Sequence, residues 1–410
     1  MSAARIRTLL FSTLYPSTAR PLHGIFVETR LRHLLATGAV ETRVVAPVPW
    51  FPSTDPRFGD WARMAATPAF ERRHDVEVSH PRYLLPPKVG MSIAPFALAL
   101  GARRAIAKLI REGFDFDLID AHYYYPDGVA AGLLARWFGK PFVVTARGTD
   151  LNVLPQFAVP RRLIQWTARR AAASIGVSKA LIQVLAGLNA PAERLLALRN
   201  GVDLQRFRLL DKVESRRALG LPEAARILLT VGHLVELKGN DIVIDAIARL
   251  RQQGTDAFLA IVGDGEERGR LQAQAEARGI AESVRFAGAV VNAELAPWYA
   301  AADCLVLASS REGWPNVLLE SMACGTPVVA TRLASTPEIV REPVAGELFE
   351  PRTADALEAA IDKVLRRRTD PNVLRTYAEQ FGWDATSRAQ VELFESVLAM
   401  RSLRCREVAL

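Results

Sequence analysis

Residues 304–330 read CLVLASSREGWPNVLLESMACGTPVVA, and this stretch decides the fold. An apolar run, Cys304–Leu307, precedes a helical pattern over Asn316–Cys324, and a second apolar run, Val328–Ala330, follows it. Pro315 stands where the first turn of a helix tolerates proline, and a glycine closes the helix. Because neither apolar run alternates with polar residues, both are typical of strands buried on two faces. The stretch therefore predicts a strand–helix–strand unit of a parallel sheet.

The same alternation of apolar runs and helical patterns extends along the chain. Further strands are expected at Ile6–Ser12, Arg43–Pro47, Val76–Ser79, Leu118–His122, Phe142–Ala146, Ser174–Val177, Leu195–Leu198, Ile227–Val231, Phe258–Val262 and Val284–Phe286. Further helices are expected at Ile25–Ala36, Ile93–Arg111, Gly128–Phe138, Arg161–Ala173, Lys179–Ala186, Asp241–Gln253, Glu267–Arg278, Ala293–Ala301, Ala354–Arg368 and Ala385–Met400. This order predicts the α/β class, with two doubly wound, Rossmann-like domains.

Length and composition agree with two globular domains. The chain has 410 residues, of which 50% are hydrophobic and 23% charged, and this excludes a disordered or fibrous protein. The turn-rich tetrapeptide Asn200-Gly201-Val202-Asp203 closes the seventh expected strand, so we place a boundary there, between domains of residues 1–200 and 201–384. Ligands of such sheets bind beyond the carboxyl ends of the strands, in a cleft where two sheets face each other.

Charge differs between the two halves. Residues 1–200 carry 26 basic and 14 acidic side chains, a net +12, whereas residues 201–410 carry 26 and 30, a net −4. Two domains with different partners are indicated, and the basic half would suit nucleic acid, a phosphorylated substrate or an anionic membrane. The three cysteines have no metal-ligand spacing and the longest apolar stretch is too short to cross a bilayer, so we expect a cytoplasmic protein.

Two carboxylates flank the start of the Asn316–Cys324 helix. The first backbone N–H groups of a helix and its dipole form an anion site, here around Gly313 to Val317. Glu312 stands just before this site and Glu320 about two turns later, and paired carboxylates accept hydrogen bonds from hydroxyl-rich ligands. In the alternative interpretation, Glu312 only offsets the helix dipole and Glu320 is a solvated helix residue.

The segment resembles the signature of family 4 retaining glycosyltransferases of the GT-B fold. The resemblance rests on Glu312, Gly313, Asn316, Glu320, Ser321, Ala323, Gly325, Pro327 and Val328. It extends over nearly the whole chain, through Arg5–Tyr15 with Gly24, Asp120-Ala121-His122, Pro126-Asp127-Gly128, Val177-Ser178, Asn200–Asp203, Lys238-Gly239, Val262–Gly265 and Val284–Gly288. It implies that the acceptor binds the N-terminal domain, that the nucleotide-sugar donor binds mainly the C-terminal one, and that residues 385–410 cross back to the first domain.

The resemblance also implies roles for single residues. Glu320 would accept hydrogen bonds from the ribose, and Lys238 would neutralise the diphosphate. Glu312 and the backbone of Gly313, Trp314, Pro315 and Asn316 would hold the donor sugar and the diphosphate. Gly24 would allow a loop to approach the phosphates, His122 would contact the donor sugar, and the backbone at Phe286 would meet the base. His122, Lys238 and Glu312 are thus the expected catalytic residues, with no metal and no cofactor.

Two positions depart from the family pattern. His233 stands where an arginine is usual, and a diphosphate would favour its charged form, so it is either a phosphate contact or a loop residue. Arg147 stands where histidine is common, and it would bind donor phosphates or a phosphorylated acceptor, or form a structural ion pair with Asp150. Gly263-Asp264-Gly265 is interpreted as a strand-to-helix turn rather than a nicotinamide site, and Asp115, Asp117 and Asp120 as turn and solvent-facing residues rather than a metal cluster.

Basic, apolar helices in the first half suit an anionic membrane face. Lys88, Arg103, Arg104, Lys108 and Arg111 accompany one apolar helix, and Arg161, Arg162, Arg169 and Arg170 accompany another that holds Trp166. Ordinary solvated helix faces are the alternative, and nucleic acid is disfavoured because no binding module is present. The expected enzyme transfers a sugar from a UDP- or GDP-sugar to a glycan or lipid-linked glycan, peripheral to the cytoplasmic membrane. A sugar-nucleotide epimerase and a non-catalytic donor-binding scaffold are the competing hypotheses.

Overall fold

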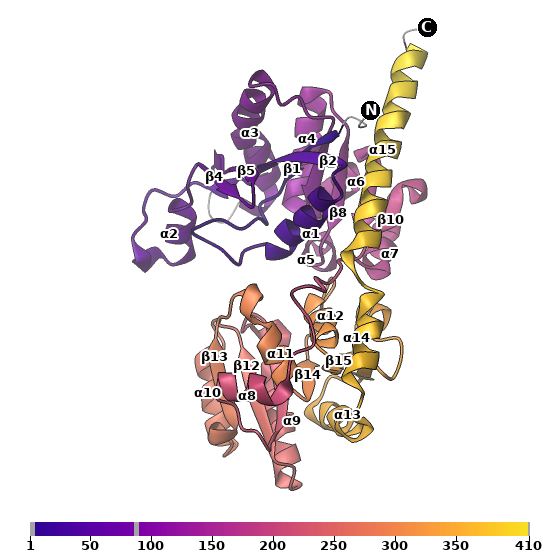
Figure 1. The fold of residues 1–410 in the computed structure, drawn as a ribbon. Coiled ribbons are helices and arrows are strands. Elements are labelled where there is room, and N and C mark those ends of the chain that lie inside the picture. The colour runs from indigo at the N-terminus through magenta and orange to yellow at the C-terminus, as the bar shows by residue number, and fades with distance from the viewer. Residues whose placement is uncertain (1–4, 86–89, 409–410) are drawn as a thin grey trace. The chain divides into compact units, whose positions relative to one another are not determined.

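The computed structural model describes residues 5–85 and 90–408, so Lys88 of the predicted basic surface lies outside the described residues. Internal contacts divide the chain into one unit of residues 1–200 with 383–410 and a second unit of residues 201–382. Each unit is built on its own sheet of mainly parallel strands with helices as crossovers (Figure 1). The predicted α/β class is therefore confirmed. None of the described helices is both long and apolar enough to cross a bilayer.

The first unit contains an eight-stranded sheet in the order β10-β9-β8-β7-β1-β2-β5-β4. The strands are β1 (Ile6–Phe11), β2 (Val40–Val45), β4 (Phe70–Arg73), β5 (Val76–Ser79), β7 (Leu118–His122), β8 (Phe142–Ala146), β9 (Ala173–Gly176) and β10 (Leu195–Ala197), with β3 (Val48–Pro49) and β6 (Arg82–Tyr83) forming a separate pair. The helices are α1 (Ile25–Ala36), α2 (Asp60–Ala65), α3 (Gly90–Arg111), α4 (Val129–Phe138), α5 (Thr149–Asn152), α6 (Ala158–Arg170), α7 (Lys179–Gly187) and α15 (Trp383–Val408). All strand pairs in this sheet are parallel except β4 with β5.

The second unit contains a six-stranded parallel sheet in the order β13-β12-β11-β14-β15-β16. The strands are β11 (Arg226–Val231), β12 (Ala257–Val262), β13 (Val284–Gly288), β14 (Cys304–Leu307), β15 (Val328–Thr331) and β16 (Gly346–Phe349). The helices are α8 (Lys212–Leu219), α9 (Asn240–Gln252), α10 (Arg268–Ala277), α11 (Ala296–Ala301), α12 (Asn316–Ala323), α13 (Ala354–Arg367) and α14 (Pro371–Glu379). Every strand predicted from an apolar run is present within a few residues of its expected bounds.

The elements missing from the sequence prediction have polar or short patterns. Strand β4 is rich in charged residues, lies at a sheet edge and joins β5 through His74 and Asp75, both in the left-handed region. Helices α2, α8 and α14 and strand β16 were also not predicted. An apolar run marks a strand that is buried on both faces, and these elements lie at edges or on the surface, where that pattern is absent.

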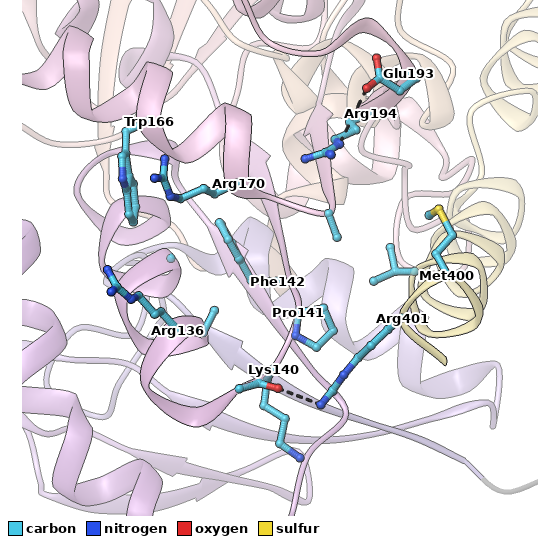
Figure 2. A pocket seen from close by; sticks show the side chains of 15 residues that line it. Arg136, Lys140, Pro141, Phe142, Trp166, Arg170, Glu193, Arg194, Met400 and Arg401 are labelled. Carbon is cyan, nitrogen blue, oxygen red and sulfur yellow. Dashed lines mark hydrogen bonds and ion pairs between the residues drawn. The ribbon is translucent and has the colours of Figure 1, made fainter. Parts of the chain in front are cut away.

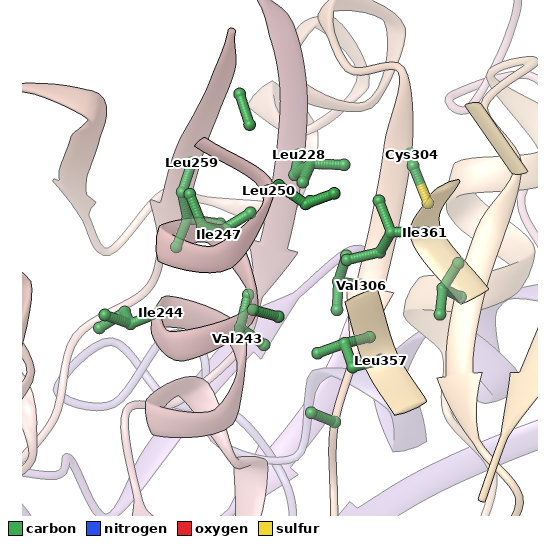
Figure 3. Packing of buried hydrophobic residues seen from close by; sticks show 14 of the residues in the cluster. Leu228, Val243, Ile244, Ile247, Leu250, Leu259, Cys304, Val306, Leu357 and Ile361 are labelled. Carbon is green, nitrogen blue, oxygen red and sulfur yellow. The ribbon is translucent and has the colours of Figure 1, made fainter. Parts of the chain in front are cut away.

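Buried aliphatic side chains fix the sheet of the second unit against its helices. Val243, Ile247 and Leu250 of α9 and Leu357 and Ile361 of α13 pack on the strands (Figure 3). Each is at most 2% exposed, so truncating any one of the leucines or isoleucines to alanine would cost about 2–5 kcal/mol. This rigid core holds the carboxyl ends of β11, β12 and β14 at one edge.

The last helix belongs to the first unit. Trp383, at the start of α15, stacks on His33 of α1 with ring centroids 5.2 Å apart. Phe394 and Val397 then pack against Leu34 and Leu118 in a buried cluster. The chain thus leaves the first unit after residue 200 and returns to it at residue 383.

Candidate functional site

Lys238 and Glu312 meet at the carboxyl edge of the second sheet. Nζ of Lys238 lies 2.6 Å from Oε1 of Glu312, and Oγ of Ser309 donates to the same carboxylate at 2.7 Å. Gly239 makes this contact possible, because a Cβ there would lie 2.3 Å from the carbonyl oxygen of Ala308, just after β14. The turn after β11 can therefore press on the loop after β14 and bring the lysine to the glutamate.

Glu312 lies in a loop, and the helix starts only at Asn316. The two-turn spacing expected between the two glutamates is therefore wrong, since a helical count applies only from Asn316 onward. Asn316 and Glu320 are four residues apart on α12 and share one face. Pro315 precedes the helix, and its side chain has no polar atom that could cap the first N–H groups. The positive end of the α12 dipole therefore lies next to the Glu312 loop.

Glu320 is a partly buried carboxyl group with an unusual acidity. Tyr299 of α11 donates its hydroxyl to Oε2 of Glu320 at 2.7 Å. Burial raises the pKa of Glu320 to about 7, while the hydrogen bond from Tyr299 and the charge of Arg206 oppose the shift. The group therefore changes charge near neutral pH, and the interpretation of Glu320 as an ordinary solvated residue is wrong.

The glycine turns after β11 and β12 pack backbone against backbone. A Cβ on Gly263 would lie 1.8 Å from the carbonyl oxygen of Gly232, and both residues have positive φ. A Cβ on Gly265 would lie 2.4 Å from the carbonyl oxygen of Leu234. The two turns leave the His233 ring exposed at the same edge as Lys238. The Gly263 segment is the strand-to-helix turn that was predicted.

Two aromatic residues of the predicted donor site are packing residues. Trp314 is 7% exposed, and its indole nitrogen has no hydrogen-bond partner in the described part of the chain. Phe286 packs its partly buried ring against the core of the second unit. Strand β13 is an edge strand, so its backbone has one unpaired side there. Contact of the main chain at Phe286 with the base stays a prediction, and the free edge of β13 leaves room for it.

In the first unit, His122 ends β7 inside a buried hydrogen-bond network. Its Nδ1 contacts Nη2 of Arg147, and its Nε2 lies 3.3 Å from Oδ2 of Asp120. A guanidinium only donates, so Nδ1 accepts and Nε2 carries the proton. Burial lowers the pKa of His122 to about 4. The negative charge of Asp120 opposes this shift, whereas the positive charge of Arg147 adds to it. His122 is therefore neutral near pH 7, with both ring nitrogens engaged.

Arg147 is held by neighbours other than the one considered from the sequence. Its Nη1 donates to Oδ1 of Asn200 at 2.9 Å, and its guanidinium lies over the ring of Phe26. Asp150 instead accepts backbone N–H groups, including those of Arg147 and Gly148. The alternative of an Arg147–Asp150 ion pair is therefore wrong. Nε of Arg147 is a buried donor that has no partner among the described residues.

Asp120 and Gln390 complete this network and were missed as site residues. Asp120 is 2% exposed, so its assignment as a solvent-facing residue is wrong. Nε2 of Gln390 on α15 donates to Oδ2 of Asp120 at 3.0 Å, and Oε1 of Gln390 accepts from Nε of Arg30 at 2.8 Å. A charged residue inside the apolar run Leu118–His122 was the available sign of burial for Asp120. No sequence pattern linked Gln390 to it.

The remaining predicted positions behave as loop residues. Gly24 has a φ of 68°, and a Cβ there would lie 2.3 Å from the carbonyl of Leu14, so only glycine fits. Asp115 pairs with Lys140, and Asp117 accepts the N–H of Arg7. Among the side chains of residues 5–85 and 90–403, no three His, Cys, Asp or Glu residues cluster as metal ligands would.

Comparisons with known proteins place both units among sugar-transferring enzymes. Residues 29–206 match the model of glycosyltransferase family 4, and residues 211–381 match that of glycosyl transferases group 1. The chain is similar to D-inositol 3-phosphate glycosyltransferase 1 of Catenulispora acidiphila, with 33% identity over 71% of this chain and 75% of that protein. It is also similar to the putative teichuronic acid biosynthesis glycosyltransferase TuaC of Bacillus subtilis, with 26% identity over 96% and 99% of the two chains.

The fold has a counterpart among solved structures. Anabaena HepE in complex with UDP-glucose superimposes with a TM-score of 0.70, over 96% of this chain and all of that one, at 20% identity. At this identity the likeness concerns the fold alone. It extends across both units of the chain.

Proposed function

Because this chain belongs to family 4 of the glycosyltransferases, we propose that it transfers a sugar from a UDP- or GDP-sugar to a glycan or lipid-linked glycan, for cell-surface polysaccharide. Members of this family are retaining enzymes. The observation that carries the proposal is the Lys238–Glu312 pair, 2.6 Å apart, beside the positive end of α12. It brings a cation, a hydroxyl-binding carboxylate and helix N–H groups to one edge, which suits a sugar diphosphate.

The second unit would bind the donor. A departing nucleoside diphosphate accumulates negative charge, and Lys238, the start of α12 and the exposed His233 would stabilise that charge. Glu312 would hold hydroxyls of the donor sugar, and Glu320 would accept hydrogen bonds from the ribose. The main chain at Phe286 would meet the base, which explains why side chains encode the base poorly. No metal and no cofactor enter this proposal.

The first unit would bind the acceptor and help to position the donor sugar. Gly24 would let its loop approach the phosphates, and His122 would border the sugar with its ring held by Asp120 and Arg147. The unpartnered Nε of Arg147 supports a phosphate contact for this residue. The acceptor hydroxyl would attack on the face that the diphosphate leaves, and the leaving phosphate would take its proton. No side chain is assigned as a covalent nucleophile.

Peripheral binding to an anionic membrane is the second part of the proposal. Helix α3 exposes Met91, Phe96 and Leu100 beside Arg103 and Arg104, which suits the interface of an anionic bilayer. Such a contact would bring a lipid-linked acceptor to the enzyme. The relative TuaC, named for teichuronic acid biosynthesis, supports a cell-surface glycan as the product.

The decisive experiment measures nucleoside diphosphate release from a panel of UDP- and GDP-sugars, with and without a lipid-linked glycan extract. We expect release only when donor and extract are both present. A new epimer formed from the donor alone would favour the epimerase hypothesis. Donor binding without turnover in any extract would favour the scaffold hypothesis. A thermal-shift screen with the same donors identifies the base, since a bound ligand stabilises the folded state.

A further inference from the structure

A pocket of about 880 Å³ lies in the first unit at the edge of the sheet opposite to His122 and Arg147. Its lining comes from the residues just before β8, β9 and β10 and from the last turns of α4 and α6, with one wall from α15 (Figure 2). His122 ends β7 and Arg147 follows β8, so both lie at the carboxyl ends of the strands. The pocket is therefore separate from the proposed transfer site.

The interior of the pocket is apolar. Phe142 and Val397 are nearly fully buried beneath it, and the half-exposed Met400 stands at its rim. Gly132 makes room for the ring of Trp166, because a Cβ on this glycine would lie 2.7 Å from Cζ3 of the tryptophan. A surface of this kind binds an apolar chain rather than a hydrated ion.

The rim of the pocket is strongly basic. Five cationic side chains line it, Arg136, Lys140, Arg170, Arg194 and Arg401, and the only carboxylate among its lining residues is that of Glu193. Three of these cations have structural partners. Lys140 pairs with Asp115, Arg194 donates to the carbonyls of Arg169 and Ala171, and Arg401 donates to the carbonyl of Gly139. The two arginines thereby satisfy carbonyls at the ends of α4 and α6.

Arg136 and Arg170 remain without a counter-charge. No carboxylate of the described residues lies within ion-pair distance of either guanidinium. Arg170 lies over the ring of Trp166 at 4.7 Å, which holds it in place and leaves its charge uncompensated. Figure 2 shows Arg136 and Arg170 beside Trp166 on one wall, with Met400 on the opposite wall. Two uncompensated guanidiniums next to an apolar interior suit a phosphate attached to an apolar chain.

We propose that this pocket binds one anionic phospholipid, with its phosphate at Arg136 and Arg170 and an acyl chain along Phe142, Trp166 and Val397. Charge complementarity selects the anionic head group, and the apolar interior selects a lipid over free phosphate. This inference deepens the proposed membrane contact, because it locates a discrete lipid site whose lining includes no residue of α3.

The test uses a lipid that stays dispersed as single molecules, so that a bilayer is not needed. Dihexanoylphosphatidic acid is titrated into the full-length protein by calorimetry, beside dihexanoylphosphatidylcholine and inorganic phosphate. We expect one phosphatidic acid per chain and at least about tenfold weaker binding of the other two probes, since both a charge-assisted contact and apolar contact are required. Equal binding of phosphate, equal binding of phosphatidylcholine, or no binding of phosphatidic acid overturns the proposal.

Matched variants locate the binding. The double variant Arg136→Gln with Arg170→Gln should weaken the binding of phosphatidic acid by about tenfold or more, because both charged donors are lost. The double variant Arg103→Gln with Arg104→Gln on α3 should leave it unchanged. Met400→Asp should also weaken binding, whereas Leu403→Asp, one turn further along α15 and outside the pocket lining, should not. All these side chains are exposed, so thermal unfolding should confirm folded variants. Binding that survives the first double variant contradicts the site.

The membrane proposal is tested separately. Sedimentation with vesicles of phosphatidylglycerol and phosphatidylcholine measures bilayer binding of the same variants. If the α3 variant no longer sediments with vesicles but binds dispersed phosphatidic acid with unchanged affinity, the membrane-binding surface of α3 and the pocket are distinct sites. A protein that binds dispersed phosphatidic acid but no vesicle would retain the lipid site and refute the membrane proposal.

Discussion

The ammonium of Lys238 lies 2.6 Å from Oε1 of Glu312, although 74 residues separate the two in the chain. The side chains of Lys238 and Glu312 are 25% and 13% exposed, so solvent screens their attraction and the pair contributes little to the free energy of unfolding. Its effect is to hold a cation and a hydroxyl acceptor together at the carboxyl edge of the sheet. A ligand that carries both phosphate and hydroxyls would use both groups.

Replacing Lys238 should therefore reduce activity far more than stability. We expect Lys238→Ala to lower kcat by about 10²–10³, the usual cost of losing one preorganised charge on a leaving group. Its melting temperature should stay within a few degrees of the wild type. The measurements are nucleoside diphosphate release and thermal unfolding. Lys212→Ala is the control, because Lys212 also pairs with an acid, Asp303, in the same unit but away from the site. Equal activity losses in the two variants would contradict the role of Lys238.

Donor affinity should depend on pH through Glu320. Its pKa is about 7, so it becomes protonated as the pH falls through 7, and a neutral carboxyl accepts ribose hydrogen bonds less well. We expect the Kd for an intact nucleotide sugar to rise several-fold between pH 8 and pH 6 by this mechanism. Titration calorimetry at a series of pH values measures it. Glu320→Gln should show weaker binding and a flat profile, and an unchanged slope in that variant would refute the role.

Tyr299 provides a finer test of the same carboxyl group. Its hydrogen bond opposes the upward pKa shift, so Tyr299→Phe should move the midpoint of the donor-binding profile to higher pH. Linkage gives a second readout. The pKa of Glu320 is raised from 4.5 to about 7 in the folded state, so its protonated carboxyl group favours folding. This contribution to the unfolding free energy is complete below pH 4.5 and is lost as the pH rises through 7. The difference in unfolding free energy between wild type and Glu320→Gln should change over that range.

His122 should remain neutral throughout the physiological range. Its folded pKa of about 4 lies below the ordinary 6.5, so the unfolded state takes up its proton first. The associated stability is present above pH 6.5 and is lost as the pH falls through 4. Nitrogen NMR should show the Nε2-protonated tautomer at pH 7, with Nδ1 as an acceptor. A titration near pH 6.5, or the opposite tautomer, would contradict the Arg147–His122–Asp120 arrangement.

Gln390 should stabilise the first unit through its hydrogen bonds, although 270 residues separate it from Asp120 in the chain. Gln390→Leu removes its bonds to Asp120 and Arg30 and leaves both charged groups buried, so we expect a loss of about 1–3 kcal/mol in unfolding free energy. Chemical denaturation measures the loss. Glu395→Leu, at an exposed position of the same helix, should change stability by less than about 0.5 kcal/mol. Similar losses of unfolding free energy in the two variants would mean that the hydrogen bonds of Gln390 do not stabilise the unit.

Activity should persist without divalent metal, because Lys238 and the start of α12 are proposed to stabilise the leaving diphosphate. Release of nucleoside diphosphate should be unchanged after dialysis against EDTA. A loss of activity that Mg²⁺ or Mn²⁺ restores, but that an equal amount of NaCl does not, would contradict this part of the proposal.

Most of the sheet framework could be predicted from the sequence, because doubly buried strands produce continuous apolar runs. Strands β7, β8 and β14 have the predicted bounds for that reason. Strand β4 and helices α8 and α14 could not be predicted, because edge and surface elements carry polar residues. The segment Glu312–Glu320, which we propose to bind the donor, was visible in the sequence because its residues are close together in the chain.

By itself, then, the sequence determined the α/β class and the positions of Lys238, Glu312 and Glu320. Only the tertiary structure decided that Lys238 pairs with Glu312 and that burial and Tyr299 set the acidity of Glu320. It also decided that His122 is neutral, bound between Asp120 and Arg147, and that Gln390 reaches Asp120. The physical reason is that strand and helix patterns are local, whereas desolvation and hydrogen bonding depend on which distant side chains share an interior.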